Sequence, residues 1–230
     1  MAILDFETYR KEITRELEKP GRALASHPII DKINRGELTR TQLAGWANQI
    51  YLQTRDVVRW IGALYANCPS PKFRRELFLN LLEEEMGGVT GTDAHPELMA
   101  RVGMAFGLKR EEMDSAPVLP ATAIVMRLGE LHLAHRPWVV GMGNAMGFEY
   151  QSPRAFKLIA DGLRKSYKLS DHDVLFFDVH VTADEDHSGT ILRALHEHAT
   201  TPELQREAME TAGLFAAAYY QMLSTYEAFA

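Results

Sequence analysis

The sequence predicts an all-α protein, and three observations support this prediction. Apolar residues recur at steps of three and four over most of the chain, as at Leu43, Trp46, Ala47 and Ile50. No segment shows the alternating β-branched pattern that is typical of strands. Proline and glycine residues stand near the ends of the periodic segments, where helices tolerate them.

Five helices are expected in the first half of the chain. The first ends before Pro20 and the second before Gly36. Thr39 is a candidate N-cap for the long third helix. Gly87 ends the fourth helix, and His95 begins the fifth. The expected ranges are 6–18, 22–34, 40–66, 71–86 and 95–107.

Five more helices are expected in the second half. Pro137 and Pro153 stand near the starts of two of them, and Ser170, with Asp173 three residues later, resembles a capping pair. The expected ranges are 118–135, 137–150, 153–166, 170–198 and 203–229. No repeat, low-complexity tract or linker divides the chain, so we expect a single domain over residues 1–230.

Composition excludes several function classes. The chain has 230 residues, of which 46% are hydrophobic and 24% charged, as in ordinary globular proteins. The formal net charge is −6 and no basic patch stands out, which argues against nucleic acid or an anionic membrane as a partner. Cys68 is the single cysteine, so no internal disulfide forms. Residues 1–11 do not resemble a signal peptide and no apolar stretch approaches membrane-span length, so we expect a cytoplasmic location.

His180, Asp184 and His187 are separated by four and three residues, which places them on one helix face. This face continues apolar on both sides, where titratable groups are unfavourable unless something compensates them. A metal ion would do so, and imidazole with carboxylate suits iron, manganese or zinc. The alternative is a solvated helix face with a capping network, since Glu185 and Asp186 indicate a solvent-facing side.

Glu149 ends an apolar helix face that is rich in small residues. Met142, Ala145 and Met146 lie seven, four and three positions before it. A carboxylate in such a place would be driven neutral by desolvation or would need a cation. The alternative is a surface glutamate at a helix end.

The acidic triplet Glu83-Glu84-Glu85 is a third candidate. The buried face of its helix is indicated by three leucines, Leu77, Leu81 and Leu82. Glu85 continues that face, Glu84 is the second choice, and Glu83 is expected to face solvent. His95 follows across a glycine loop, where it could meet Glu85. A charge run of this kind can also be simply a solvated surface.

At these residues the sequence resembles the haem-oxygenase-like diiron oxidase and oxygenase family. Its relatives by fold are the TenA-type thiaminases, the pyrroloquinoline-quinone synthase (PqqC) and the chlamydial CADD-like proteins. The matching segments extend over most of the chain: His27-Pro28, 36–39, 42–43, 80–85, 95–98, 107–108, 147–151, 162–163, 169–170, Asp173, 176–177, His180, Asp184 and His187.

The resemblance implies a haem-oxygenase-like helical bundle that forms a homodimer. It also implies six metal ligands: Glu85, His95, Glu149, His180, Asp184 and His187. Glu84 could replace Glu85, because the loop to His95 is longer than the family pattern. A substrate cavity beside the metal is implied as well, with four candidate lining residues: Trp46, Gln49, Tyr51 and Gln53.

The function expected from the resemblance is that of a non-haem diiron oxidase or oxygenase. It would use two Fe(II) ions, or manganese, and dioxygen to oxidise a small molecule in cofactor or metabolite biosynthesis, with p-aminobenzoate formation as one option. The alternatives of the same fold are a metal-independent oxidase similar to the quinone synthase and a thiaminase-like hydrolase. The second would need a nucleophilic cysteine, and Cys68 lies in an expected loop away from the metal-like stripe. A helical interaction protein without catalysis is the remaining alternative.

Overall fold

The computed structural model of the chain describes residues 2–229, apart from the side chains of residues 182–188. Every regular element within that part is helical, which confirms the all-α prediction. The α-helices are α1 (Phe6–Leu17), α2 (Pro28–Arg35), α3 (Arg40–Asn67), α4 (Pro71–Met86), α5 (His95–Ala105), α6 (Arg110–Ser115), α7 (Pro120–Gly129), α8 (Trp138–Glu149), α9 (Ser152–Tyr167), α10 (Leu175–His198) and α11 (Pro202–Leu223). Short 3₁₀ segments occupy η1 (Leu24–Ser26) and η3 (Ser224–Phe229), and η2 (Glu130–Ala134) is π-helical.

Most helix ends follow from local sequence signals. Thr39 and Gln42 form a capping box at the start of α3. Gly87 ends α4 with φ 61°, a left-handed conformation that glycine adopts without strain. The helix expected from residue 170 begins only at Leu175, because the side chains of Ser170 and Asp173 bond to each other's backbone and close a turn. The short helix α6 was not predicted.

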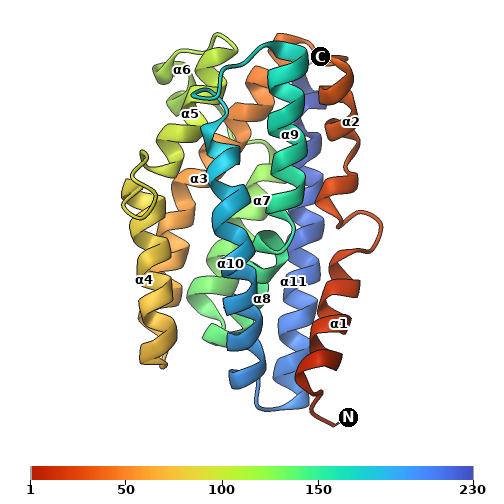
Figure 1. The fold of residues 1–230 in the computed structure, drawn as a ribbon, viewed down its shortest axis with the longest axis vertical. Coiled ribbons are helices and arrows are strands. Elements are labelled where there is room, and N and C mark those ends of the chain that lie inside the picture. Colours follow the sequence, from red (N-terminus) through yellow and green to blue (C-terminus); the bar gives the residue numbers. More distant parts are fainter. Residues whose placement is uncertain (1, 230) are drawn as a thin grey trace.

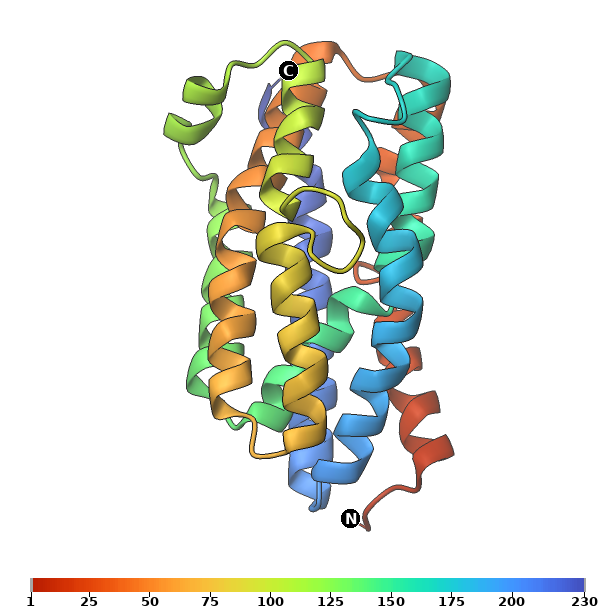
Figure 2. The same cartoon turned by 60° about the vertical axis from the view of Figure 1, so that its left-hand side comes forward.

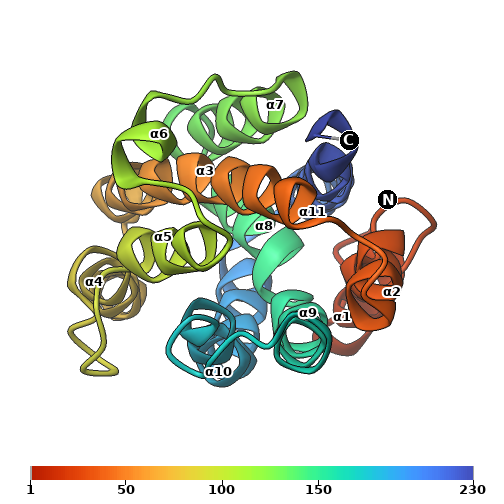
Figure 3. The ribbon, with the colours of Figure 1, turned by 90° about the horizontal axis from the view of Figure 1, so that it is seen from above.

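The long helices run roughly along one axis of the molecule (Figure 1). Seen from above, α8 lies near the middle, with α3 and α7 on one side and α9 and α10 on the other (Figure 3). The helix α8 packs against both α10 and α11. Helices α4 and α5 follow each other in one column beside α3, separated by a loop (Figure 2). Among the described residues, no helix has both the length and the apolar character needed to cross a membrane.

The contact between α8 and α11 depends on glycine. A Cβ atom added at Gly143 would lie 2.3 Å from the carbonyl oxygen of Ala208, and one at Gly147 would lie 2.5 Å from that of Ala212. Two backbones can approach this closely only where the side chain is absent. Gly143 and Gly147 lie one position after Met142 and Met146 of the predicted apolar face. Their close contact with α11 holds the end of α8, with Glu149, against the interior.

His27 links the start of α2 to the end of the chain. Its side chain is 2% exposed; Nδ1 accepts a hydrogen bond from the backbone N–H of Ile29 at 3.1 Å, and Nε2 lies 3.0 Å from the hydroxyl of Ser224. An imidazole that accepts at Nδ1 and donates from Nε2 is neutral. Burial accordingly lowers the pKa of His27 from 6.5 to about 4.

We therefore expect the fold to lose stability as the pH falls from 6.5 to about 4, because only the unfolded chain binds a proton at this residue in that window. The contribution is up to about 3 kcal/mol at 1.36 kcal/mol per pKa unit. Urea denaturation at pH 7.5 and pH 4.5 measures it. His27→Asn keeps a capping side chain that does not titrate, so its stability should fall less between the two pH values. Equal losses in both proteins would contradict the assignment.

Candidate metal centre

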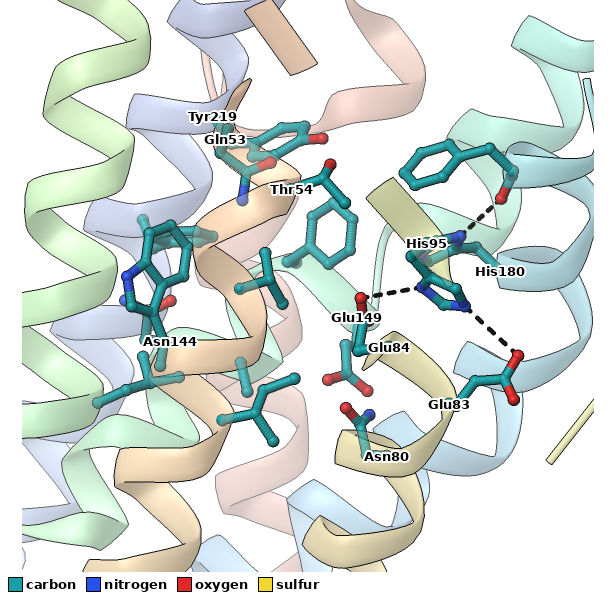
Figure 4. A pocket seen from close by; sticks show the side chains of 18 residues that line it. Gln53, Thr54, Asn80, Glu83, Glu84, His95, Asn144, Glu149, His180 and Tyr219 are labelled. Atoms are coloured by element: carbon teal, nitrogen blue, oxygen red, sulfur yellow. Dashed lines mark hydrogen bonds and ion pairs between the residues drawn. The ribbon is translucent and has the colours of Figure 1, made fainter. Parts of the chain in front are cut away.

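The break between α4 and α5 brings an imidazole against two carboxylates. His95, the first residue of α5, is 3% exposed. Its Nδ1 lies 3.0 Å from Oε2 of Glu84, and its Nε2 lies 3.4 Å from Oε1 of Glu83 (Figure 4). Neither ring nitrogen makes a hydrogen bond of good geometry within the described part of the chain. Both buried nitrogens are therefore satisfied by carboxylate charge alone.

Glu83 is held in place by the loop that follows α4. Its carboxylate accepts hydrogen bonds from the backbone N–H groups of Val89 and Thr90, each at 2.9 Å, and from the hydroxyl of Thr90 at 2.5 Å. Burial alone would raise the pKa of Glu83, but these hydrogen bonds and the nearby His95 lower it overall. Glu83 is 4% exposed, so the prediction that it faces solvent is wrong.

His180 reaches the same place from α10. Its Nδ1 lies 2.7 Å from the backbone carbonyl of Phe176, so this nitrogen carries the proton and the lone pair is on Nε2. A backbone carbonyl that fixes the tautomer in this way is one of the common partners of a metal-binding histidine. The ring centroids of His180 and His95 are 4.5 Å apart. One ligand atom each from Glu84, His95 and His180 lie within 4.8 Å of one another.

The electrostatics of this cluster favour a cation. Burial alone would lower the pKa of His95, but the carboxylates of Glu84 and Glu83 raise it to about 9. The two acidic groups thus stabilise a positive charge at the imidazole. A metal ion bound here would replace the proton as the positive charge beside these carboxylates. Carboxylate with imidazole is a donor set that iron and manganese accept.

A cavity opens beside the cluster and continues towards α11 (Figure 4). Its volume is about 80 Å³, whereas a single water needs roughly 10–15 Å³. Apolar side chains form most of its wall: Val57, Trp60, Ile61, Leu133, Ala145, Phe148, Phe176 and Phe215. Glu149 of α8 and Asn80 of α4 also line it. A smaller apolar cavity of about 50 Å³ shares Asn80 and Glu149 with the first.

Comparison with known proteins agrees with this arrangement. The sequence pattern of a family described as iron-containing redox enzymes matches residues 44–220, which is more than half of the chain. The chain belongs to this family. All the residues of the buried cluster lie within the matched range, and their donor atoms fit an iron ion. The protein is therefore an oxidoreductase of the iron-containing redox enzyme family.

Two named relatives and one solved structure are similar to this chain. A 4-aminobenzoate synthase from Nitrosomonas europaea is 28% identical over 212 residues, which cover 88% of this chain and 84% of that protein. A pyrroloquinoline-quinone synthase from Cronobacter sakazakii is 38% identical over 96 residues, covering 41% and 37%. A solved domain with a heme oxygenase-like fold from Shewanella denitrificans superposes with a TM-score of 0.77 at 17% identity, covering 99% of this chain and 94% of that one. The haem-oxygenase-like fold is confirmed.

The structure places one of the six expected ligands, Glu85, away from the cluster. Glu85 is exposed and lies on the outer face of α4, beside Tyr51 and Arg110, whereas Glu84 contacts His95. Of the two carboxylates considered, the second choice, Glu84, is therefore the one that lies in the cluster. The reason is that one helical step of about 100° turns Glu85 away from the interior.

The other predicted ligands have different outcomes. His95 and His180 lie in the cluster, and Glu149 lies on the wall of the adjoining cavity. The side chains of Asp184 and His187 are outside the described residues, so their role stays a prediction.

Of the four predicted cavity residues, only Gln53 lines the cavity. Trp46 is fully buried and stacks on Phe177, with ring centroids 6.2 Å apart. Gln49 bonds to the backbone of the segment before α7, at Pro117 and Leu119. Tyr51 faces the opposite side of α3, where its hydroxyl bonds to Asp114. These three predictions are wrong for two reasons. The cavity is lined by α3 only from Gln53 onward, about two turns after Trp46, and Tyr51 points away from it.

Sequence reasoning did not assign several residues that line this cavity to it. They are Glu83, Thr54, Asn80, Asn144 and Tyr219. Asn80 lies one helical turn before Glu84, so the spacing of four residues was an available signal. Asn144 lies five residues before Glu149 on the small-residue helix, where a lone buried amide is itself unusual.

Cys68 lies at the end of α3 and does not line either cavity described above. It is 2% exposed, and burial raises the pKa of its thiol, which disfavours the nucleophilic thiolate. We expect Cys68→Ser to leave iron content and dioxygen consumption within about twofold of the unchanged protein. An oxygen electrode and metal analysis measure both. An inactive but folded variant would instead support a cysteine nucleophile.

Proposed function

We propose that this protein is a non-haem diiron enzyme that uses dioxygen to oxidise a small molecule in cofactor or metabolite biosynthesis. The observation that carries the proposal is the buried group of Glu84, His95 and His180 beside an apolar cavity. Titratable side chains that are buried together either pair with one another or hold metal ions, and helical bundles use such groups for metal sites. Membership of the iron-containing redox enzyme family supports iron as the metal.

The proposed ligands are three carboxylates and three imidazoles. Glu84, His95 and His180 form the described cluster, and Glu149 approaches from α8. Asp184 and His187 complete the set by their spacing of four and seven residues from His180. Three negative charges against two Fe(II) ions leave a modest positive charge, and manganese accepts the same donors.

Iron, when bound, would supply the redox chemistry with dioxygen. The protein would position the metal ligands and keep water out of the site. Glu83, fixed by the loop at Val89 and Thr90, sets the orientation of the His95 ring. The Phe176 carbonyl holds the tautomer of His180. The aromatic wall excludes water from the space where a substrate would lie.

The relative named 4-aminobenzoate synthase supports 4-aminobenzoate formation as the first reaction to examine. A metal-independent oxidase similar to the quinone synthase, or a hydrolase of the same fold, remains the alternative. We also propose a homodimer in the cytoplasm, as the family resemblance implies. Light scattering during gel filtration would test the dimer, with twice the chain mass of 26.0 kDa expected.

Anaerobic loading with ferrous ion tests the proposed function. We expect about two iron ions per chain after removal of unbound metal, and rapid dioxygen consumption when air is admitted. Manganese-loaded protein serves as the control for dioxygen consumption. A chain that retains no stoichiometric iron would contradict the proposal and favour the metal-independent alternative.

A further inference from the structure

The end of the cavity opposite the acidic cluster is polar but uncharged. Four side chains form it: Gln53 and Thr54 of α3, Asn144 of α8 and Tyr219 of α11 (Figure 4). The cavity therefore has two unlike ends, joined by an apolar wall in which four of the eight side chains are aromatic. A molecule bound between them would need an apolar body and a polar group at the far end.

Gln53 is the clearest sign that this end receives a ligand. Its side chain is 5% exposed, and its amide makes no hydrogen bond with any described residue. Gln49, one turn earlier on the same helix, has both ends of its amide bonded to the backbone at Pro117 and Leu119. Gln53 instead presents a donor and an acceptor to the cavity.

Asn144 presents an acceptor at the same end. Its Nδ2 donates to the carbonyl oxygen of Leu128 at 3.3 Å and lies 3.1 Å from Nδ1 of His132. Both N–H groups are thereby directed into the protein, which fixes the orientation of the amide. His132 belongs to the π-helical segment η2, and such segments often mark functional sites. The carbonyl oxygen of Asn144 is left for a ligand that donates.

Charge restricts the ligand further. Among the eighteen described residues that line the cavity, none is lysine or arginine. The charged groups are the acids Glu83, Glu84 and Glu149 and the imidazole of His95, and none of these four belongs to the polar end. A carboxylate or phosphate brought inside would be desolvated without a fixed cation at the polar end. The wall includes five aromatic rings, from Trp60, Phe148, Phe176, Phe215 and Tyr219, which suit a flat, ring-sized body.

We propose that this cavity selects an uncharged, ring-sized substrate whose hydroxyl or amide group bonds to Gln53 and Asn144. The inference rests on the proposed function, since it names the substrate class of that same site. The polar end holds the far group of the substrate while its apolar body lies towards the acidic cluster. An aromatic carboxylate such as 4-aminobenzoate would then be a product that the cavity releases rather than a substrate that it retains.

Calorimetric titration with two matched probes tests this selectivity. The probes are 4-methylbenzyl alcohol and 4-methylbenzoate, which share the ring and differ in charge. They are titrated into the full-length chain, both metal-free and loaded anaerobically with ferrous ion. We expect the alcohol to bind at least about tenfold more tightly in both forms. Equal or tighter binding of the benzoate, or no measurable binding of the alcohol, would overturn the proposal.

Gln53→Leu tests the residue itself, because leucine keeps the bulk and removes the amide. We expect it to weaken binding of the alcohol about tenfold, as loss of one or two buried hydrogen bonds does. Gln221→Leu, an exposed position on α11, is the matched control and should change nothing. Unchanged affinity in a folded Gln53→Leu protein, as judged by circular dichroism, would refute the role of Gln53.

Iron content separates this inference from the proposed function. Gln53 is not among the proposed ligands, so Gln53→Leu should load as much iron as the unchanged chain. Selective alcohol binding in a chain that holds no iron would preserve the inference about the cavity and contradict the diiron function. Full iron loading with a preference for the benzoate would support the diiron function and contradict the inference about the cavity.

Discussion

Glu84→Gln is expected to lower the affinity of the chain for ferrous ion at least about 100-fold. Residues that merely orient a metal ligand change affinity about 10- to 100-fold, and Glu84 is a proposed ligand. The substitution removes one negative charge and leaves the shape almost unchanged. It also removes the carboxylate that faces Nδ1 of His95 at 3.0 Å. Competition with a ferrous chelator under anaerobic conditions measures the change.

Glu85→Gln is the matched control. It removes the same charge one residue later, from an exposed side chain on the outer face of α4. Its iron affinity should stay within about twofold of the unchanged chain, since exposed charges are screened by solvent. If Glu85→Gln lost iron and Glu84→Gln kept it, the assignment of the carboxylate would be reversed.

Gly143→Ala is expected to destabilise the fold by about 3 kcal/mol, the upper end of the usual cost of overpacking. The new Cβ would lie 2.3 Å from the carbonyl oxygen of Ala208, and a backbone atom cannot move aside as a flexible side chain can. The helices α8 and α11 would have to separate. Urea denaturation followed by circular dichroism gives the free energy of unfolding.

Gly62→Ala provides the comparison within α3. No atom lies within 4 Å of a Cβ built there, and alanine is favoured over glycine inside a helix by about 0.5–1 kcal/mol. We expect this variant to be slightly more stable than the unchanged chain. Similar stabilities for the two variants would contradict the close contact between α8 and α11.

The helices and their ends could be predicted because their signals are local. Capping at Thr39 and the left-handed glycine at Gly87 act through neighbouring residues, so the sequence alone reveals them. The turn at Ser170 and Asp173 carries the same signal as a helix start, which is why α10 was expected five residues too early. Such side chains compete with the helix for backbone groups.

The choice between Glu84 and Glu85 could not be made from the sequence. We placed the inner face of α4 by its leucines, but Leu81 and Leu82 are only half-buried. The stripe that faces the interior runs instead through Phe73, Asn80 and Glu84. The helix face that carries a metal site must contain polar side chains. A search for the most apolar face of α4 therefore selects a neighbouring face.

Long-range contacts explain the remaining misses. Glu83 is buried because the loop at Val89 and Thr90 folds back and donates to it, which no spacing within α4 indicates. Tyr51 is of a residue type that often lines cavities. Its hydroxyl instead bonds to Asp114 on α6, a helix that was not predicted. The position of the cavity along α3 depends on how α4, α8 and α11 pack around it.

Anomalous diffraction at the iron edge, from crystals loaded anaerobically with ferrous ion, tests the central claim most directly. That claim is that the acids and imidazoles buried between α4, α5, α8 and α10 hold iron. We expect a strong peak in contact with Glu84, His95 and His180, and a second one on the Glu149 side. No iron peak among these side chains, or iron held only at surface carboxylates, would contradict the account.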